Sequence, residues 1–225
     1  MSSLCGMGPA IDSEAAAQSW LVETLGADAT AMDRLRELVA LLAAENQLQN
    51  LVSRGSMAAV WQRHIVDSAQ LLHVSRGTPG AWLDLGTGAG FPGLVIAALQ
   101  PERSVVLVDS RRLRTDWLER AAIALGLVHV QVVLARVEDL PSRKHAVISA
   151  RAFAPLPRLL ALSARFSTPQ TLWLLPKGAK ARHELQELGE EWAHTFHVEQ
   201  SLTDSAAGVL VGHVLGRPDR KGARP

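Results

Sequence analysis

Cysteine is almost absent from this sequence. The 225 residues contain one, Cys5, so the chain forms no intramolecular disulfide and holds no cysteine-rich metal site. This usage suits a reducing compartment. Metal-ligand spacings are missing too, since no His-x-His or paired-carboxylate pattern surrounds His64 or Asp67. We therefore expect no metal.

Long hydrophobic runs are also missing. No apolar stretch approaches the roughly 20 residues that cross a bilayer, and the first residues lack the pattern of a secretory signal. Hydrophobic residues make up 48% of the chain and charged residues 20%, as in ordinary globular proteins. We expect a cytoplasmic protein without membrane contact or an obligate protein partner, and a monomer.

Excess charge of one sign is the third absence. The formal net charge is +1, whereas a domain that holds free nucleic acid by charge is strongly basic. Basic residues still cluster locally, and such clusters are either solvated surface or phosphate contacts. The clusters are Arg111, Arg112 and Arg114; Arg143 and Lys144; and, in the tail, Arg217, Arg220, Lys221 and Arg224.

Four glycines stand in the stretch around which the chain is organised, residues 81–93. An apolar run at 81–85 leads into Gly86, Gly88, Gly90 and Gly93, and an apolar helical segment follows. Glycines at this spacing allow positive φ and let main-chain N–H groups face a ligand. The stretch predicts a nucleotide-type binding loop. A turn without a ligand is the alternative, but such turns rarely need four glycines between two acids.

Two cofactors fit this loop. The last three glycines match the dinucleotide spacing GxGxxG, and the first three match the GxGxG loop of class I methyltransferases, which bind S-adenosylmethionine. Asp84 separates them, because a carboxylate suits the cationic methionine end and would repel a pyrophosphate. Asp109, which ends the next apolar run, is placed to accept hydrogen bonds from the ribose. We favour S-adenosylmethionine.

Three helices are expected before this loop. They cover 13–25, about 30–45, and a segment from after Ser56 to before Gly77, with a polar break at 46–53. Thr30 and Asp33 resemble a capping box for the second helix. We expect a disordered N-terminus at 1–11, a helical extension at 12–77, a core at 78–215 and a flexible basic tail at 216–225.

Strands and helices alternate from residue 81 onward, which is typical of a parallel sheet covered on both faces. A short turn between the last two strands predicts a closing hairpin. The fold class is therefore α/β, a Rossmann-like class I methyltransferase with a mainly parallel seven-stranded sheet. The expected strands are 81–85, 104–109, 130–134, 145–149, 171–175, 194–202 and 207–215, and the helices are 92–100, 111–125, 156–166 and 179–192.

Ligands of such sheets bind at the carboxyl ends of the strands. The loop 136–139 then offers Val137 to an adenine face, with Glu138 or Asp139 at its edge, or is only a polar loop. Arg151 follows the fourth strand, where the acceptor is usually met, and an arginine there binds a phosphate or carboxylate. A surface arginine is the alternative.

His64 and Asp67 share a helix face at i and i+3. This spacing allows an acid–base pair. A packed histidine beside a solvated or capping aspartate is the simpler interpretation, and without further evidence we prefer it.

The absence of two catalytic motifs excludes some classes of methyl acceptor. The Asp/Asn-Pro-Pro-aromatic loop of amine and amide methyltransferases is replaced by Ser149-Ala-Arg-Ala-Phe-Ala-Pro, and Cys5 is no nucleophile for pyrimidine carbon 5. Direct in-line attack on the methyl group by an atom with a free lone pair remains. Guanine N7 is such an atom and needs no general base.

Several motifs together resemble one family from about residue 30 to 215. They are Asn50-Leu-Val-Ser, Arg63-His-Ile-Val-Asp-Ser68, Leu83-Asp-Leu-Gly-Thr-Gly-Ala-Gly-Phe-Pro-Gly93, Arg136-Val-Glu138, Ser149-Ala-Arg-Ala152 and Leu175-Pro-Lys-Gly178. Their order is similar to that of the bacterial ribosomal RNA small-subunit methyltransferase G family, also called glucose-inhibited division protein B.

The resemblance implies methyl transfer from S-adenosylmethionine to N7 of one guanine in 16S ribosomal RNA. It implies cofactor contacts at Gly86, Phe91, Val137, Glu138 and Arg151, and functional roles for His64, Asp67 and Lys177 beside Arg151. Arg151 is expected to hold the donor's carboxylate, guanine O6 or a phosphate, because a donor on N7 would block the attacking lone pair.

One departure concerns the last strand. Many family members have Gly-x-Arg before it, whereas Ala206-Ala-Gly-Val-Leu carries no arginine, so an RNA contact from that hairpin is in doubt. The low basicity fits 16S RNA presented in the small ribosomal subunit better than free RNA. Competing interpretations are a methyltransferase of the same fold acting on a small molecule or protein, a nicotinamide-dependent oxidoreductase, and a ribosome-assembly module with a vestigial loop.

Overall fold

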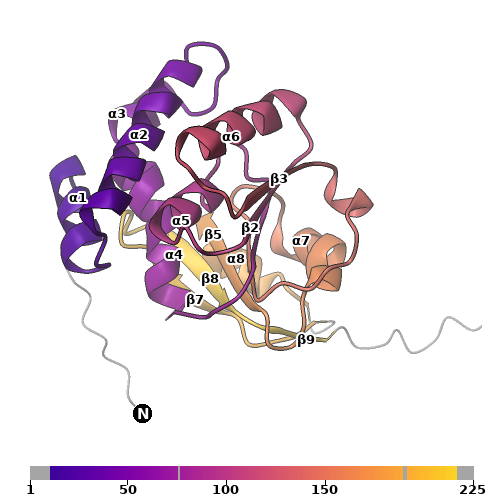
Figure 1. The fold of residues 1–225 in the computed structure, drawn as a ribbon. Coiled ribbons are helices and arrows are strands. Elements are labelled where there is room, and N and C mark those ends of the chain that lie inside the picture. The colour runs from indigo at the N-terminus through magenta and orange to yellow at the C-terminus, as the bar shows by residue number, and fades with distance from the viewer. Residues whose placement is uncertain (1–10, 76, 190–191, 217–225) are drawn as a thin grey trace, which may run out of the picture.

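The computed structural model describes residues 11–75, 77–189 and 192–216. Figure 1 shows the N-terminal helices gathered at one side of an α/β core. The predicted tails, 1–11 and 216–225, fall outside the described residues except at their inner ends. There the boundaries need correction, because Ile11 is buried and donates its N–H to the carbonyl of Leu202, and Gly216 ends a strand.

The N-terminal extension contains more pieces than the sequence predicts. Helices α1 (Glu14–Glu23) and α2 (Ala29–Glu45) match the first two predicted helices, but the third is divided into α3 (Arg54–Ala58), a π-helix η1 (Trp61–Val66) and α4 (Asp67–Ser75). The Glu14 carboxylate explains the new start, because it accepts hydrogen bonds from the backbone N–H groups of Trp61 and Gln62. A side chain 47 residues away therefore caps the π-helix.

Local capping also differs from the prediction at α2. The N-cap is Asp28, whose carboxylate accepts from the N–H of Ala31, and not Thr30. Aspartate at an N-cap satisfies one of the free amide groups of the first turn. The polar break at 46–53 is confirmed: the Asn46 side chain accepts from the N–H groups of Leu51 and Val52 and so closes the turn.

The sheet has the predicted topology. Its seven strands are ordered β3-β2-β1-β4-β5-β8-β7; neighbours among β1 to β5 are parallel, and β7 and β8 are antiparallel to their neighbours. The parallel strands are β1 (Trp82–Leu85), β2 (Val105–Asp109), β3 (Val130–Leu134), β4 (Val147–Ser149) and β5 (Leu172–Gly178), and the hairpin is β7 (His197–Gln200) with β8 (Gly208–Gly212). The outer ends of the predicted hairpin form a separate pair, β6 (Ala193–His194) with β9 (Val214–Gly216).

Helices cover both faces of this sheet. On one face lie α5 (Gly93–Leu99) and α6 (Arg112–Ala124), and on the other α7 (Leu156–Ser163), followed by the short turn η3 (Ala164–Phe166). The 3-10 turn η2 (Val137–Asp139) follows β3. The last helix, α8 (Ala181–Gln186), is shorter than the predicted 179–192.

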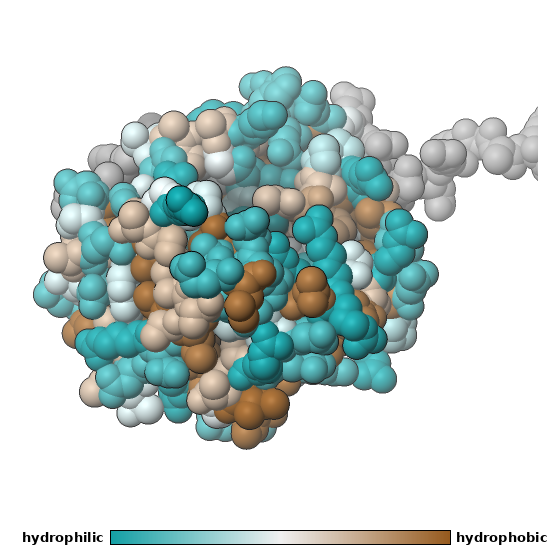
Figure 2. Space-filling model, turned by 90° about the horizontal axis from the view of Figure 1, so that it is seen from above, coloured by the Kyte–Doolittle hydropathy of each residue, from teal (hydrophilic) through white to brown (hydrophobic). Residues whose placement is uncertain are grey.

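The N-terminal extension belongs to the same hydrophobic core as one face of the sheet. Leu35, Leu38 and Leu42 of α2 are fully buried in one cluster with Leu94 of α5 and Leu118 of α6. Burying each such leucine stabilises the fold by about 1.5–3 kcal/mol. The extension is thus a covering layer, fixed against the sheet. Figure 2 shows hydrophilic and hydrophobic residues interspersed on the face seen from above.

No helix in the described ranges is long and apolar enough to cross a membrane.

Candidate functional site

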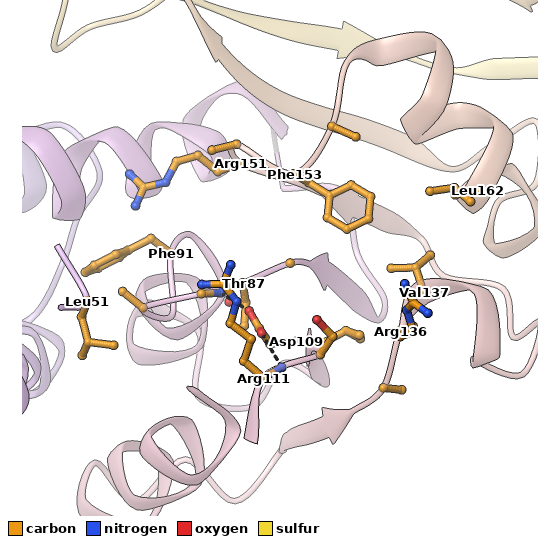
Figure 3. Close-up of a pocket in the computed structure, with 18 of the residues that line it drawn as sticks. Leu51, Thr87, Phe91, Asp109, Arg111, Arg136, Val137, Arg151, Phe153 and Leu162 are labelled. Carbon is orange, nitrogen blue, oxygen red and sulfur yellow. Dashed lines mark hydrogen bonds between the residues drawn. The ribbon is translucent and has the colours of Figure 1, made fainter. Parts of the chain in front are cut away.

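A cavity of about 640 Å³ lies at the carboxyl ends of the parallel strands (Figure 3). Its walls come from the loops after β1, β2, β3 and β4 and from the N-terminal extension. These are the four loops that the sheet rule predicts. The main lining residues are Leu51, Ser53, Ser56, His64, Gly86, Thr87, Gly88, Phe91, Asp109, Arg111, Arg136, Val137, Glu138, Arg151, Phe153, Arg158 and Leu162; we call this the first cavity.

The glycine loop forms the floor of the first cavity. Gly86 has φ of +66°, and a Cβ there would lie 2.5 Å from Cδ2 of Phe153, so only glycine fits. Gly88, with φ of +59°, donates its N–H to Asp109 Oδ2 at 3.0 Å. The other oxygen, Oδ1, accepts from the N–H of Arg111. Asp109 is therefore held rigidly, with lone pairs left for a further donor.

Asp84, for which the sequence predicts a cofactor contact, lies in the protein interior. It is fully buried and does not line the first cavity. Its Oδ2 accepts from the N–H of Gly93 at 3.0 Å, and its Oδ1 accepts from Ser149 Oγ at 2.7 Å. Burial raises its pKa to about 6, opposed by these hydrogen bonds and by the Arg151 charge. Asp84 ties the start of α5 to β4 and supports the loop from below.

Gly90 does not line the first cavity either. A Cβ at this position would lie 2.4 Å from Cδ1 of Leu94, so the glycine serves the packing of the loop on α5. The cofactor contact expected of Gly90 stays a prediction.

One end of the first cavity is apolar. Figure 3 shows Val137, Leu162 and Phe153 around this end. Val137 is 4% exposed, and its carbonyl and that of Glu138 accept hydrogen bonds from Arg165 Nη2. The turn η2 is thereby fixed against η3. The predicted residues Val137 and Glu138 both line the first cavity, as does the aromatic ring of Phe153.

Arg151 occupies the other end of the first cavity, together with Phe91. Its guanidinium carbon lies 5.1 Å from the centre of the Phe91 ring, within cation–π range. The following residue, Ala152, has φ of +51°, an uncommon backbone conformation for a non-glycine residue that costs on the order of 1–2 kcal/mol. The loop after β4 is therefore held in one strained shape that directs Arg151.

His64 and Asp67 hold Arg151 from the N-terminal extension. Both terminal nitrogens of Arg151 lie 3.3 Å from His64 Nδ1, and Nη1 lies 3.3 Å from Asp67 Oδ2. Asp67 Oδ1 accepts from Gln70 and Thr203. Burial raises the pKa of Asp67, while Arg151 beside it acts in the opposite direction. The predicted residues are thus brought together, as an arginine with two supporting groups.

His64 is neutral in this environment. Burial, together with the charges of Arg151 and Arg63, lowers its pKa to about 3. Because Arg151 donates to Nδ1, the ring proton is on Nε2, which is buried without a hydrogen-bond partner. The ring stacks on Phe91 at 4.8 Å between centroids. His64 therefore packs, accepts from Arg151 and gains no charge near neutral pH.

Lys177 is also tied into the structure. Its Nζ donates to the carbonyl of Ala154 at 2.6 Å and lies 2.9 Å from Glu184 Oε2, which accepts from the N–H of Leu156. The Lys177 and Glu184 side chains are 6% and 14% exposed. This buried pair fastens the loop after β4 at its far end, and Lys177 does not line the first cavity.

A second cavity of about 610 Å³ adjoins the first. The two share Ser56, His64 and the loop 151–155, so Arg151 stands at their border. The second cavity is further lined by Arg63, Asp67, Pro176, Lys177, Gly178, Glu184, Ser201, Thr203, Asp204, Ala207, Gly208 and Val209.

Among residues 11–75, 77–189 and 192–216, no group of three or more His, Cys, Asp or Glu side chains is placed to hold a metal ion.

The first cavity suits S-adenosylmethionine. Its volume lies within the range of about 300–1,000 Å³ typical of small-molecule sites. Gly86 leaves room that any Cβ would fill, the apolar end matches an adenine, and Asp109 in the middle has free lone pairs for ribose hydroxyls. Arg151 at the opposite end matches a carboxylate.

Several lining residues were not predicted as contacts. Leu51, Ser53 and Ser56 lie in the polar break and at α3, and Arg158 and Leu162 lie on α7. Leu51 and Ser53 stand in the Asn50-Leu-Val-Ser motif, to which no role was assigned, whereas Ser56, Arg158 and Leu162 carry no motif of their own. They line the first cavity because the segment 51–56 and α7 lie beside it. Arg111, in a basic cluster, and Arg136, in the Arg136-Val-Glu138 motif, were not assigned a cofactor contact.

Comparisons with known proteins give the family. The family described as rRNA small subunit methyltransferase G matches residues 31–209. Relatives named ribosomal RNA small subunit methyltransferase G include a protein of Novosphingobium aromaticivorans, which is 69% identical in an alignment that covers 90% of this chain and 89% of the relative. Another, from Sphingopyxis alaskensis, is 49% identical in an alignment that covers 93% of this chain and 90% of the relative.

Solved structures confirm the fold. An O-methyltransferase from Bacillus cereus in complex with SAH has a TM-score of 0.58 at 15% identity, over 90% of this chain and 97% of that one. A methyltransferase from Geobacter sulfurreducens has a TM-score of 0.54 at 14% identity, over 80% and 90%. At these identities the likeness concerns the fold alone, and it is that of the class I methyltransferases.

Proposed function

The chain belongs to the rRNA small subunit methyltransferase G family, and from this premise we propose that it transfers a methyl group from S-adenosylmethionine to N7 of one guanine in 16S ribosomal RNA. The observation that carries the proposal is the pair of adjoining cavities that meet at Arg151, one shaped for the methyl donor and the other open for a base.

The first cavity provides the donor contacts. Val137, Phe153 and Leu162 enclose the adenine, and Asp109 accepts from the ribose hydroxyls. Arg151 holds the carboxylate of the methionine end. When bound, S-adenosylmethionine supplies an electrophilic methyl group on a sulfonium.

The step itself needs alignment more than proton transfer. The N7 lone pair of guanine forms a bond to the methyl carbon while the carbon–sulfur bond breaks; sulfur keeps the bonding pair and the positive charge passes to the guanine. N7 carries no proton, so no general base is required. Holding the two reactants in line and excluding water is the remaining source of rate.

His64 and Asp67 contribute to alignment in this scheme. They hold the Arg151 guanidinium from one side while the strained loop holds its backbone from the other. Because burial lowers the pKa of His64 to about 3, its Nδ1 stays unprotonated near neutral pH, and the ring does not act as a general acid. Lys177 supports the loop through Ala154 and Glu184.

The test is labelled-methyl transfer to small-subunit RNA and to intact small subunits from a strain that lacks the gene, followed by nucleoside analysis. The expected product is 7-methylguanosine. Arg151→Ala should reduce transfer more than 100-fold, whereas Arg182→Ala, a matched change of an exposed arginine on α8 outside both cavities, should leave it unchanged.

The opposing outcome is also clear. If neither substrate is labelled while S-adenosylmethionine still binds, the RNA substrate is wrong, and a small molecule or a protein takes its place as acceptor.

A further inference from the structure

The second cavity has a different charge from the first. Four arginines and two carboxylates line the first cavity, namely Arg111, Arg136, Arg151, Arg158, Asp109 and Glu138. Three cations and three carboxylates line the second, namely Arg63, Arg151, Lys177, Asp67, Glu184 and Asp204. During methyl transfer, the positive charge passes from the sulfonium in the first cavity to the guanine in the second. The lining of the second cavity is the less positive of the two, so this movement of charge stabilises the transition state.

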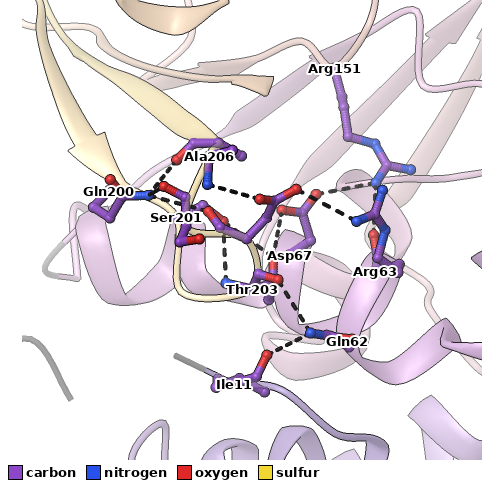
Figure 4. A network of polar contacts seen from close by, with 12 residues as sticks. Ile11, Gln62, Arg63, Asp67, Arg151, Gln200, Ser201, Thr203 and Ala206 are labelled. Atoms are coloured by element: carbon purple, nitrogen blue, oxygen red, sulfur yellow. Dashed lines mark hydrogen bonds and ion pairs between the residues drawn. The ribbon is translucent and has the colours of Figure 1, made fainter. Parts of the chain in front are cut away.

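The hairpin turn that closes the second cavity is fixed against the N-terminal extension. Figure 4 shows this turn, between β7 and β8, facing the helix that carries Arg63 and Asp67. Gln62 donates to the carbonyls of Ile11 and Thr203, and Thr203 Oγ1 donates to Asp67. These hydrogen bonds fix the turn, which forms one wall of the second cavity.

Asp204 is the carboxylate of this wall with hydrogen-bonding capacity to spare. Its Oδ1 accepts from the N–H of Ala206, which orients the side chain, and its Oδ2 lies 3.6 Å from Arg63 Nη1. That separation is too long for a hydrogen bond. The Asp67 and Glu184 carboxylates, by contrast, already bind Arg151 and Lys177 at 3.3 and 2.9 Å.

We propose that the second cavity receives the target guanine extruded from its RNA, and that the Asp204 carboxylate accepts hydrogen bonds from guanine N1–H and the N2 amino group. The inference rests on the proposed function. With N7 directed to the border at Arg151, the Watson–Crick edge of the base points into the second cavity. Adenine presents a lone pair at N1, which a carboxylate repels, so Asp204 selects guanine. Enzymes that modify a base commonly extrude it and read this edge.

The experiment compares two RNAs and three proteins. Once the methylated guanosine is located with the wild-type protein, small-subunit RNA is prepared with guanosine or with inosine at that position. Inosine keeps N7 and N1–H but lacks the N2 amino group. Wild-type kcat/KM should fall about 10–100-fold on inosine, because each lost base contact is worth about 1–3 kcal/mol. This arm needs no variant and is independent of folding.

Asp204→Asn should lower kcat/KM on guanosine RNA at least 10-fold and leave the Kd for S-adenosylmethionine unchanged. For this variant, kcat/KM on inosine RNA should be less than about threefold below that on guanosine RNA, because the contact with the N2 amino group is already lost. Glu199→Gln, an equal change of charge on the half-exposed β7 and outside both cavities, should match the wild type on both RNAs.

Equal wild-type activity on the two RNAs, or a full inosine penalty in Asp204→Asn, would overturn the role of Asp204. Absence of any 7-methylguanosine with the wild type would instead overturn the proposed function.

Discussion

The guanidinium of Arg151 lies 3.3 Å from the carboxylate of Asp67, which joins the loop after β4 to the first turn of α4. The two side chains are 23% and 20% exposed, so solvent screens the pair only in part. This contact makes the N-terminal extension a component of the donor site.

Asp67→Asn should therefore lower kcat/KM about 10-fold, because Arg151 loses the charge that orients it. The Kd for S-adenosylmethionine should rise with it, as isothermal titration measures. Asp33→Asn is the matched control, since it breaks the exposed pair with Arg36 on α2, and no change is expected there. An Asp67→Asn enzyme with wild-type kinetics would show that Arg151 is oriented by its loop alone.

Lys177 and Glu184 give a second prediction. Lys177→Met leaves the Glu184 carboxylate buried without a cation and the Ala154 carbonyl without its donor, and should cost about 3 kcal/mol in the free energy of unfolding. In Lys177→Met/Glu184→Gln no buried charge remains, and the glutamine still accepts from Leu156. Urea unfolding should show most of the stability restored, with activity restored alongside. A double variant that is stable but inactive would instead make Lys177 a group that acts on substrate.

Gly86 gives a third prediction. Gly86→Ala should raise the Kd for S-adenosylmethionine more than 10-fold, because the added Cβ would lie 2.5 Å from Phe153 and displaces the wall of the first cavity. Gly126→Ala is the control: Gly126 has the same φ of +66° and no atom within 4 Å of an added Cβ. It should lower stability by about 1–2 kcal/mol and leave the Kd unchanged. Similar Kd values for the two variants would contradict the steric argument.

Asp84 predicts how stability depends on pH. Its pKa is raised from 3.8 to about 6 in the folded protein, so between these values the folded state binds a proton that the unfolded state has lost. The contribution of Asp84 to stability is therefore complete below about pH 4 and falls as the pH rises through 6, by about 3 kcal/mol in all. Asp84→Asn should remove this part of the slope in urea unfolding measured from pH 4 to 7. If the free energy of unfolding of Asp84→Asn depends on pH as in the wild type, groups other than Asp84 bind the protons responsible.

Much of the fold could be predicted because its signals are local. The alternation of strands and helices, the glycine loop and the turn before β8 each lie within a short window of sequence. What escaped prediction depends on distant partners. Glu14 starts the π-helix from 47 residues away, and nothing near Trp61 indicates this.

The site shows the same division. Asp109 and Arg151 could be nominated because Asp109 ends β2 and Arg151 follows β4, at the same edge of the sheet. Asp84 also belongs to a strand, but the sequence does not indicate that its carboxylate accepts hydrogen bonds from Gly93 and Ser149 in the protein interior. Lys177 stood in a recognisable motif, yet its partner Glu184 did not, so their ion pair became visible only in three dimensions.

The hairpin turn at 201–206, between β7 and β8, is synthesised after all the residues that line the first cavity. Every residue that lines the first cavity lies between positions 51 and 162, whereas the second is completed by residues up to Val209. A chain leaving the ribosome therefore contains the whole lining of the donor site well before it contains the wall that admits a base. The second cavity is therefore completed last during synthesis, by the same hairpin that completes the sheet.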